Sequence, residues 1–117
     1  MRYLSPSSGF DSGRASLSLE PADNVQAIVL AAGVAERVTL PVAAGGQPAA
    51  KYCLFSATGD FFAKFGDNTV TAIVPSGDIT DGTAPELNPV MRTKPSGVTH
   101  VSLISASAIT VTIAFYS

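Results

Sequence analysis

The chain has 117 residues, 14% of them charged, and a formal net charge of −2, whereas about a quarter of the residues of a typical soluble domain are charged. This length fits one domain with one hydrophobic core, and the lone cysteine excludes an intrachain disulfide. The few Lys and Arg residues form no basic patch that could follow a phosphate backbone, and no apolar run is long enough to cross a bilayer. We therefore expect neither nucleic acid nor a membrane as a partner.

Weakly charged surfaces are typical of two kinds of protein. One is the secreted β-protein rich in Ser and Thr; the other is the subunit that its neighbours largely cover, because charge is depleted where interfaces are buried. Residues 1–10 contain no apolar run that could act as a signal peptide. We expect synthesis in a host cytoplasm without an export signal, which favours the covered subunit.

The first 14 residues are rich in Ser, Gly and Arg and predict an extended N-terminal arm with apolar side chains at Tyr3, Leu4 and Phe10. One interpretation is a frayed terminus. The other is an arm that docks on a neighbouring subunit through these three side chains. Residues 15–117 are expected to form a single β domain.

Alternation and apolar runs indicate strands in the first half of this domain. Residues 15–20 (ASLSLE) alternate and predict a short strand. The apolar run 25–32 predicts a strand buried on both faces; a short helix is the other interpretation, because periodicity cannot distinguish the two. Residues 34–42 alternate again, and the inner face of that strand is expected to begin at Val38.

Residues 51–57, 61–65 and 69–75 all have strand-forming composition, and Gly-containing turns separate them. This spacing predicts a three-stranded antiparallel meander. Because Phe61 and Phe62 are adjacent, they must face opposite sides, and one of them is expected to be exposed or in an interface. Short antiparallel elements at this spacing predict an all-β sandwich or a partly closed barrel.

A long loop is expected at residues 76–97, where three prolines and three glycines exclude a long helix or a regular strand. Loops of this length are usually functional or disordered. The isolated apolar residues Ile79, Leu87, Val90 and Met91 favour a structured loop that docks on another surface.

A strict period of two marks residues 109–116, where Ile109, Val111, Ile113 and Phe115 share one face. We expect this strand in the middle of a sheet or against a partner. Upstream, Val101 also alternates with polar neighbours, and a small polar run at 105–107 separates the two segments, which predicts a β-hairpin.

Few residues are candidates for chemistry. Cys53 lies in an apolar run and is interpreted as a small buried hydrophobe. Asp78, Asp81 and Glu86 do not have EF-hand spacing, and the two aspartates are expected to form Asx-type turns. His100 is expected on the outward side of its strand, and no nucleophile motif accompanies it.

Three motifs follow one another along the chain. They are a strand with a Ser-x-x-Gly-Asp turn, 52–62 (YCLFSATGDFF); a proline-bounded Asp-Gly loop, 81–89 (DGTAPELNP); and a short hydrophobic strand, 112–116 (TIAFY). Together they resemble small virion structural proteins of tailed bacteriophages, over about the last two-thirds of the chain. The resemblance implies a β-sandwich subunit present in many copies on the capsid, or in rings at the neck or tail. It also suggests that the 78–92 loop makes contacts.

We therefore expect a virion structural protein, a capsid decoration or minor capsid subunit that is not an enzyme and needs no cofactor or metal. Its expected partners are copies of itself, in a trimer or other cyclic cluster, and the major capsid protein or other virion proteins. One alternative is a receptor- or glycan-binding β module of a phage tail or neck. Another is a small enzyme in which His100 meets an acid in a pocket. The residues expected at inter-subunit contacts are Tyr3, Leu4, Phe10, Ile79, Leu87, Asn88, Pro89 and Met91.

Overall fold

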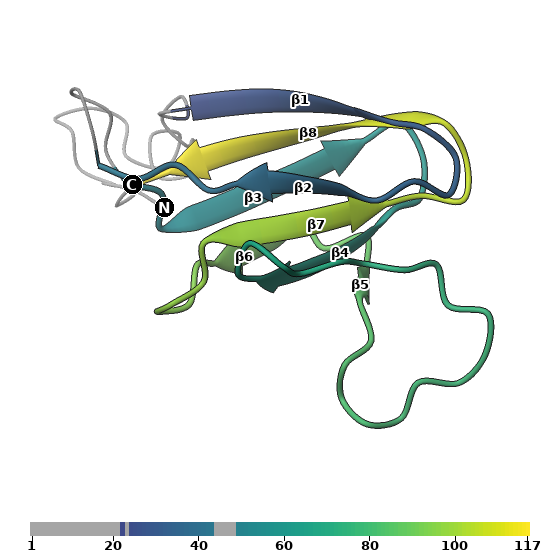
Figure 1. Ribbon diagram of the computed structural model, residues 1–117. Coiled ribbons are helices and arrows are strands. Elements are labelled where there is room, and N and C mark those ends of the chain that lie inside the picture. Colours follow the sequence, from purple (N-terminus) through teal and green to yellow (C-terminus); the bar gives the residue numbers. More distant parts are fainter. Residues whose placement is uncertain (1–21, 23, 44–48) are drawn as a thin grey trace, which may run out of the picture.

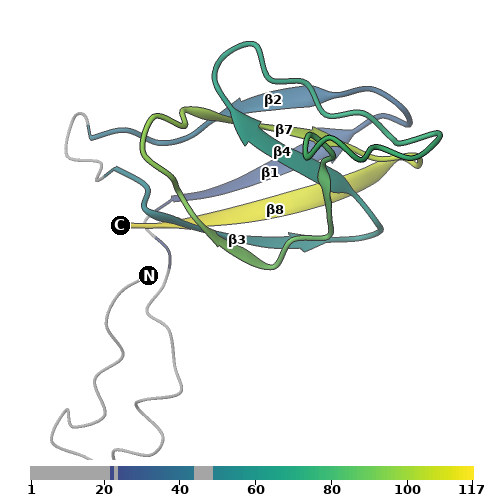
Figure 2. The same cartoon turned by 90° about the horizontal axis from the view of Figure 1, so that it is seen from below.

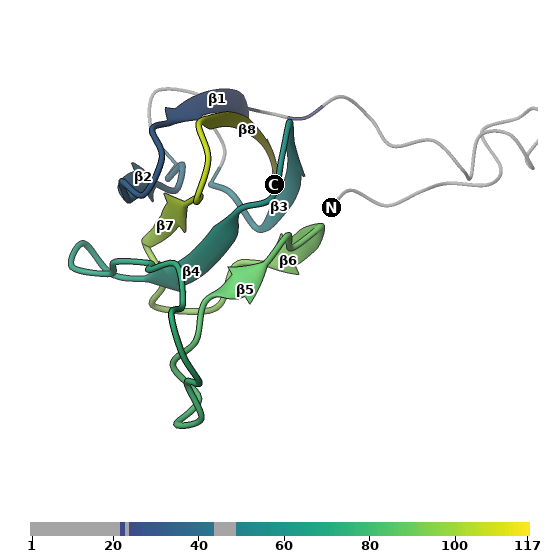
Figure 3. The same cartoon turned by 90° about the vertical axis from the view of Figure 1, so that its right-hand side faces the viewer.

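Eight β-strands in two antiparallel four-stranded sheets make up the regular structure of this protein, in a computed structural model that describes residues 22, 24–43 and 49–117 (Figure 1). The sheets lie face to face as two layers (Figures 2 and 3). Sheet A has the order β1 (Asn24–Leu30), β8 (Ile109–Tyr116), β3 (Tyr52–Ala57), β6 (Met91–Thr93). Sheet B has the order β2 (Glu36–Thr39), β7 (His100–Ile104), β4 (Phe62–Gly66), β5 (Glu86–Leu87).

The all-β class is thus confirmed, and the two separate sheets agree with the predicted sandwich rather than with a closed barrel. The described residues contain no helix. The predicted arm at 1–14 and the predicted strand at 15–20 lie outside the described residues.

Strand β8 forms the centre of sheet A, where it pairs with β1 on one side and with β3 on the other. Its inward side chains Val111, Ile113 and Phe115 are at most 1% exposed, as the alternation predicts. They meet the inward side chains of sheet B in one continuous core. The buried apolar residues of this core are Leu30, Val38, Leu40, Ala50, Cys53, Phe55, Phe61, Ala63, Val101, Leu103, Val111, Ile113 and Phe115.

The predicted β-hairpin between β7 and β8 is wrong, because β7 belongs to sheet B and β8 to sheet A. The connection crosses from one sheet to the other, so Val101 and Val111 pack on opposite sides of the core instead of side by side in one sheet. Ser105 shapes this crossing: its hydroxyl donates to the Asp60 carbonyl at 2.7 Å and accepts from the Ser107 amide at 3.1 Å. Alternation is the same in both arrangements, because it reports which side is buried and not which strand is the neighbour.

The predicted meander is also wrong. Strand β3 lies in sheet A and β4 in sheet B, so the turn between them is a second crossing. Phe55 of β3 packs against Phe61 and Phe65 across the interior, with ring centroids 5.8 and 6.1 Å apart. Rings at this separation are in contact, so these three side chains join the two sheets in one core.

The third predicted strand, 69–75, is a coil that lies on the outer face of sheet B (Figure 2). The Ala72 amide donates to the Ser102 hydroxyl at 2.8 Å, and the Arg37 guanidinium donates to the Val70 carbonyl at 2.7 Å. Gly66 lies directly under this coil, since a Cβ there would be 2.8 Å from the Cβ of Val70. Side chains of sheet B therefore take the bonds that a neighbouring strand would otherwise make.

Two further expectations concern the first strands. Residues 24–30 form a strand and not a helix, but the expectation of burial on both faces is wrong, because Val25 is 60% and Val29 70% exposed. In β2 and the residue after it, the inner face begins at Val38 as predicted, with Val38 6% and Leu40 1% exposed.

The segment 76–97 contains no long helix or strand, in agreement with its prolines and glycines. It does contain the two short strands β5 and β6, which add one edge strand to each sheet. The first part of this segment, from residue 76 to β5, projects from the sandwich (Figures 1 and 3). The loop thus crosses between the sheets at their common open edge.

Candidate interaction surface

The outer face of sheet A has no charged side chain among the described residues that form it. Side chains paired across antiparallel strands share a face, and one row runs through all four strands as Val25, Ala114, Leu54 and Met91. Rows on either side add Ala, Ser, Thr and Tyr. We call this surface the uncharged face; its members are Val25, Ala27, Val29, Thr110, Thr112, Ala114, Tyr116, Tyr52, Leu54, Ser56, Met91 and Thr93.

Strand β1 is the most exposed apolar part of the uncharged face. Val25 and Val29 point outward, and Ala27 between them is also exposed. Val25 and Val29 are paired with Ala114 and Thr110 of β8, neither of which is large enough to cover them. Covering such a surface removes apolar area from water and desolvates no ion, so a partner can bury it without the cost of stripping water from charges.

The outer face of sheet B differs from the uncharged face both in its charge and in its exposure. It carries the cations Arg37 and Lys64, which flank Ser102 in the register. The coil that includes Ala72 already covers its centre, so that Ser102 is 1% exposed although it points away from the core. On the uncharged face, by contrast, Val25, Ala27 and Val29 of β1 are exposed, whereas Tyr116 is 6% exposed.

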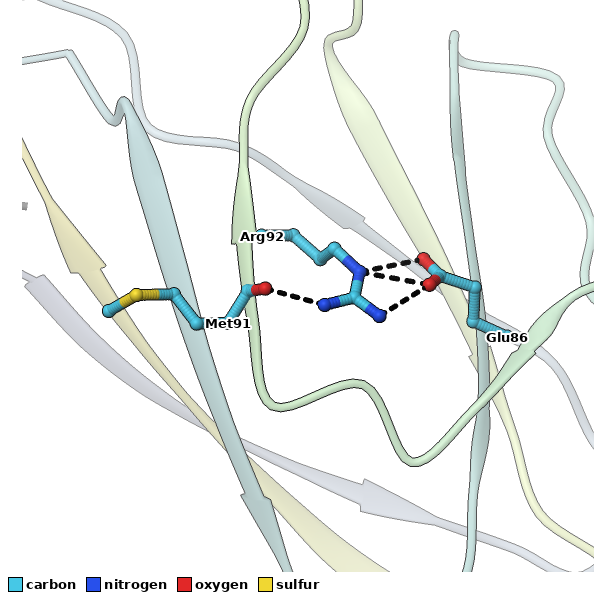
Figure 4. Close-up of polar contacts among 3 residues, drawn as sticks. All are labelled: Glu86, Met91 and Arg92. Atoms are coloured by element: carbon cyan, nitrogen blue, oxygen red, sulfur yellow. Dashed lines mark hydrogen bonds and ion pairs between the residues drawn. The ribbon is translucent and has the colours of Figure 1, made fainter.

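An ion pair closes the open edge of the sandwich, between β5 of sheet B and β6 of sheet A (Figure 4). Arg92 Nε lies 2.9 Å and Nη2 2.6 Å from Glu86 Oε2, and Arg92 Nη1 donates to the Met91 carbonyl at 2.6 Å. The Glu86 carboxylate raises the pKa of Arg92 through these bonds. Both side chains are exposed, so we expect the pair to orient the two strands more than it stabilises the fold. It orients β6, whose Met91 side chain points away from the pair toward the uncharged face.

Asn88 fixes the crossing between β5 and β6 to the turn that ends in Phe61. The backbone amide of Asn88 donates to the Phe61 carbonyl at 2.9 Å. In its side chain, Oδ1 accepts from the Phe61 backbone amide at 3.0 Å and Nδ2 donates to Asp60 Oδ1 at 2.9 Å. Asn88 has a φ of +49°, a left-handed conformation that Asn tolerates better than other side chains do. The loop is therefore held at its middle, where it changes sheets.

An open hollow of about 350 Å³ lies beside the same turn. Phe62 and Leu87 form its apolar wall, and Asp60 and the connection 105–107 form the rest with Gly59 and Ile109. Phe61 is 3% exposed and Phe62 is half-buried, so the two do face opposite sides, as predicted.

The expected contact residues do not gather on one surface. Tyr3, Leu4 and Phe10 lie outside the described residues. Met91 belongs to the uncharged face, whereas Leu87, 57% exposed, belongs to the outer face of sheet B. Ile79 is half-buried on the projecting part of the loop, Pro89 is buried within the chain, and Asn88 is engaged in the contacts just described. Their role between subunits stays a prediction.

Sequence reasoning missed the exposed valines of β1. In the run 25–32 both sets of alternate residues are apolar, so no contrast between faces marks Val25 and Val29 as outward. The only available signal was the polar Gln26, and it points inward, since it shares a face with Ile28 and Leu30. Its Nε2 donates to Asn24 Oδ1 at 3.3 Å.

The candidate residues for catalysis or metal binding lie in different parts of the described structure. Asp81 accepts from the amide and hydroxyl of Thr83, as an Asx-type turn does, and these bonds lower its pKa. His100 lies on the outer face of sheet B between Thr39 and Gly66, with Nδ1 2.7 Å from the Thr99 hydroxyl. Cys53 is fully buried in the core, as predicted. In the described ranges no three His, Cys, Asp or Glu side chains are grouped as metal ligands are.

Burial raises the pKa of the Cys53 thiol from 9.0 to about 11. Because the folded pKa lies above the unfolded one, the thiol loses its proton first in the unfolded chain. We expect its contribution to the free energy of unfolding to be complete below pH 9 and to be lost as the pH rises toward 11. Urea unfolding at several pH values measures this, with Cys53→Ala as the control for other titrating groups. Parallel pH profiles for the two proteins would contradict it.

A scan against protein-family models and searches of curated proteins and of solved structures found no match. Among the described residues no helix is long and apolar enough to cross a membrane.

Proposed function

We propose that this protein is a virion structural protein of a tailed bacteriophage, a head decoration or minor capsid subunit that stabilises the shell through contacts between subunits. The observation that carries the proposal is the uncharged face, which exposes two valines on a strand without any charged neighbour. A solvent-facing sheet normally alternates apolar side chains with charged or polar ones. A subunit whose outer sheet face is covered in place has no need of charges there.

Two further features support an assembly role. Three segments of the sequence together resemble small virion structural proteins. One of them, 81–89, includes Glu86, which is ion-paired with Arg92, and Asn88, which is hydrogen-bonded to Asp60. A loop held by such contacts presents a fixed shape to a partner, so little conformational entropy is lost when it binds. Its partners would be copies of this chain in a cyclic cluster and the major capsid protein.

The test is the composition of purified particles of the phage that encodes the protein. We expect quantitative mass spectrometry to find the chain in many copies per particle. Particles from a deletion strain should release their contents at a lower temperature than the wild type. Because the uncharged face carries no ions for salt to screen, the chain should stay on particles washed in high salt. Its absence from purified particles would overturn the proposal.

The second candidate is a receptor- or glycan-binding module, and the hollow beside Phe62 favours it. A volume of about 350 Å³ is at the lower end of the range for ligand sites. Its carboxylate, Asp60, is already bonded to Asn88, however, and Phe62 is its one aromatic wall. We therefore rank this candidate below the assembly role.

A further inference from the structure

We infer that the outer edge of β1 binds the same edge of a second copy of this chain, so that two copies of sheet A join into one continuous sheet around a two-fold axis. This inference rests on the proposed assembly role and names one partner and one contact. Its basis is the combination of an edge that no other described strand pairs with and a sequence that is complementary to itself.

The edge of β1 lacks the features that usually keep sheets apart. Among the described residues β1 has β8 as its strand neighbour on one side only. Exposed edges are normally protected by charges, prolines, bulges or very short strands. Strand β1 is seven residues long, has neither charge nor proline, and pairs with β8 in an unbroken register.

The outward side chains of β1 read the same in both directions: Val25, Ala27, Val29. If two copies pair in antiparallel fashion with Ala27 opposite Ala27, each Val25 lies opposite the Val29 of the other copy. Side chains directly opposite one another in an antiparallel pair are in contact. The two valines that are 60% and 70% exposed in one chain would then cover each other in the pair.

Charge also favours a second copy over a different partner. A charged partner would bring ions against the uncharged face and lose their hydration without compensation. An identical copy presents an identical uncharged strand, so none of the paired side chains meets an ion. An isologous contact of this kind closes on itself and gives a dimer and not a fibre, which makes the dimer the smallest of the cyclic clusters expected above.

Charge variants test both the contact and its register. In V25K/V29K every Lys lies opposite another Lys, so we expect the dimer Kd to rise about a hundredfold. In V25E/V29K each Glu lies opposite a Lys of the other copy, and we expect the Kd to return to within about tenfold of the wild type. Within one chain the two positions are about 13 Å apart along the strand, so the rescue cannot come from a contact inside one copy.

Sedimentation equilibrium over a range of concentrations measures these constants. V34K/I73K is the matched control: it adds the same charge at exposed positions outside β1 and should dimerise like the wild type. Circular dichroism checks that each variant is folded. A dimer that V25K/V29K does not weaken, or that V25E/V29K does not restore, would overturn the inference.

Hydrogen exchange separates a second copy from another occupant, the chain's own N-terminal residues. We expect β1 amides to gain protection as the concentration rises through the Kd. Protection of β1 that is the same in dilute monomer and concentrated protein would mean that the chain covers its own edge and would overturn the inference. A chain found in particles but monomeric in solution would overturn this inference alone; a chain that dimerises through β1 but is absent from particles would overturn the proposed function alone.

Discussion

Replacing Phe115 by alanine is expected to lower the free energy of unfolding by about 4 kcal/mol, the largest effect of a single substitution that we predict. Phe115 is 1% exposed and lies on the inner face of the central strand of sheet A. It is paired with Asn24 on one side and Cys53 on the other, so neighbouring strands hold its backbone and the surroundings cannot collapse into the space it leaves. The remaining cavity adds to the lost transfer free energy.

Urea denaturation followed by circular dichroism measures this loss. Thr112→Ala is the control, because Thr112 is on the same strand but on the uncharged face and should change the free energy of unfolding by about 0.5 kcal/mol or less. Equal losses in the two variants would show that the inner face of β8 is not the one that the register assigns.

Two substitutions of Asn88 are expected to separate the contribution of its side-chain hydrogen bonds to the free energy of unfolding from the cost of its left-handed backbone. Asn88→Ala loses the side-chain bonds to the Phe61 amide and to Asp60, and alanine tolerates the left-handed region less well than Asn does, so we expect a loss of about 3 kcal/mol. Asn88→Gly loses the same bonds but tolerates a φ of +49°, so we expect a loss smaller by about 1 kcal/mol. Phe61 is 3% exposed, so the substitution leaves its amide without the Asn88 Oδ1 acceptor at a largely buried residue.

The same denaturation experiment compares the two variants, and hydrogen exchange at the Phe61 amide reports the lost bond directly. Exchange there should be faster in both variants than in the wild type. If both variants unfold at the wild-type urea concentration, Asn88 does not hold the loop, and the fixed shape on which the proposed assembly role depends would lose its main support.

The sequence predicts the buried side of a strand well where apolar and polar residues alternate. Residues 109–116 and the face that begins at Val38 were predicted correctly for this reason. It fails where alternate residues are all apolar, as in 25–32, because burial on one face and on both faces then give the same pattern. The prediction placed residues 109–116 in the middle of a sheet or against a partner, and β8 is at the centre of sheet A.

Strand partners could not be predicted, because alternation contains no information about the neighbour. The connections 58–60 and 105–107 have the Gly, Ser and Asp residues of tight turns, and a turn that crosses between sheets needs the same residue types as a hairpin. The coil at 69–75 has strand-like composition, yet Ser102 and Arg37, both distant in sequence, bind its backbone groups. Only the fold brings these residues together.

The sequence did not locate the candidate surface. Scarcity of charge indicated a covered subunit, and the structure gives that scarcity a place, the outer face of sheet A. The loop residues chosen from the sequence were spread over two faces, because Leu87 and Met91 belong to strands in different sheets. A pattern of isolated apolar residues cannot show that the chain changes sheets between them.

The order of strands in sheet A has a consequence for how the protein is made. Strands β1 and β3 do not pair with each other. Both pair with β8, whose residues follow their partners in β1 by about eighty to ninety positions. A nascent chain therefore carries β1 without its strand partner until residues 109–116 have left the ribosome. Contacts between residues so distant in sequence slow folding, and an uncovered apolar strand invites aggregation in that interval. Slow translation would lengthen this interval, so we expect the yield of soluble protein to depend on how fast residues 109–116 are synthesised.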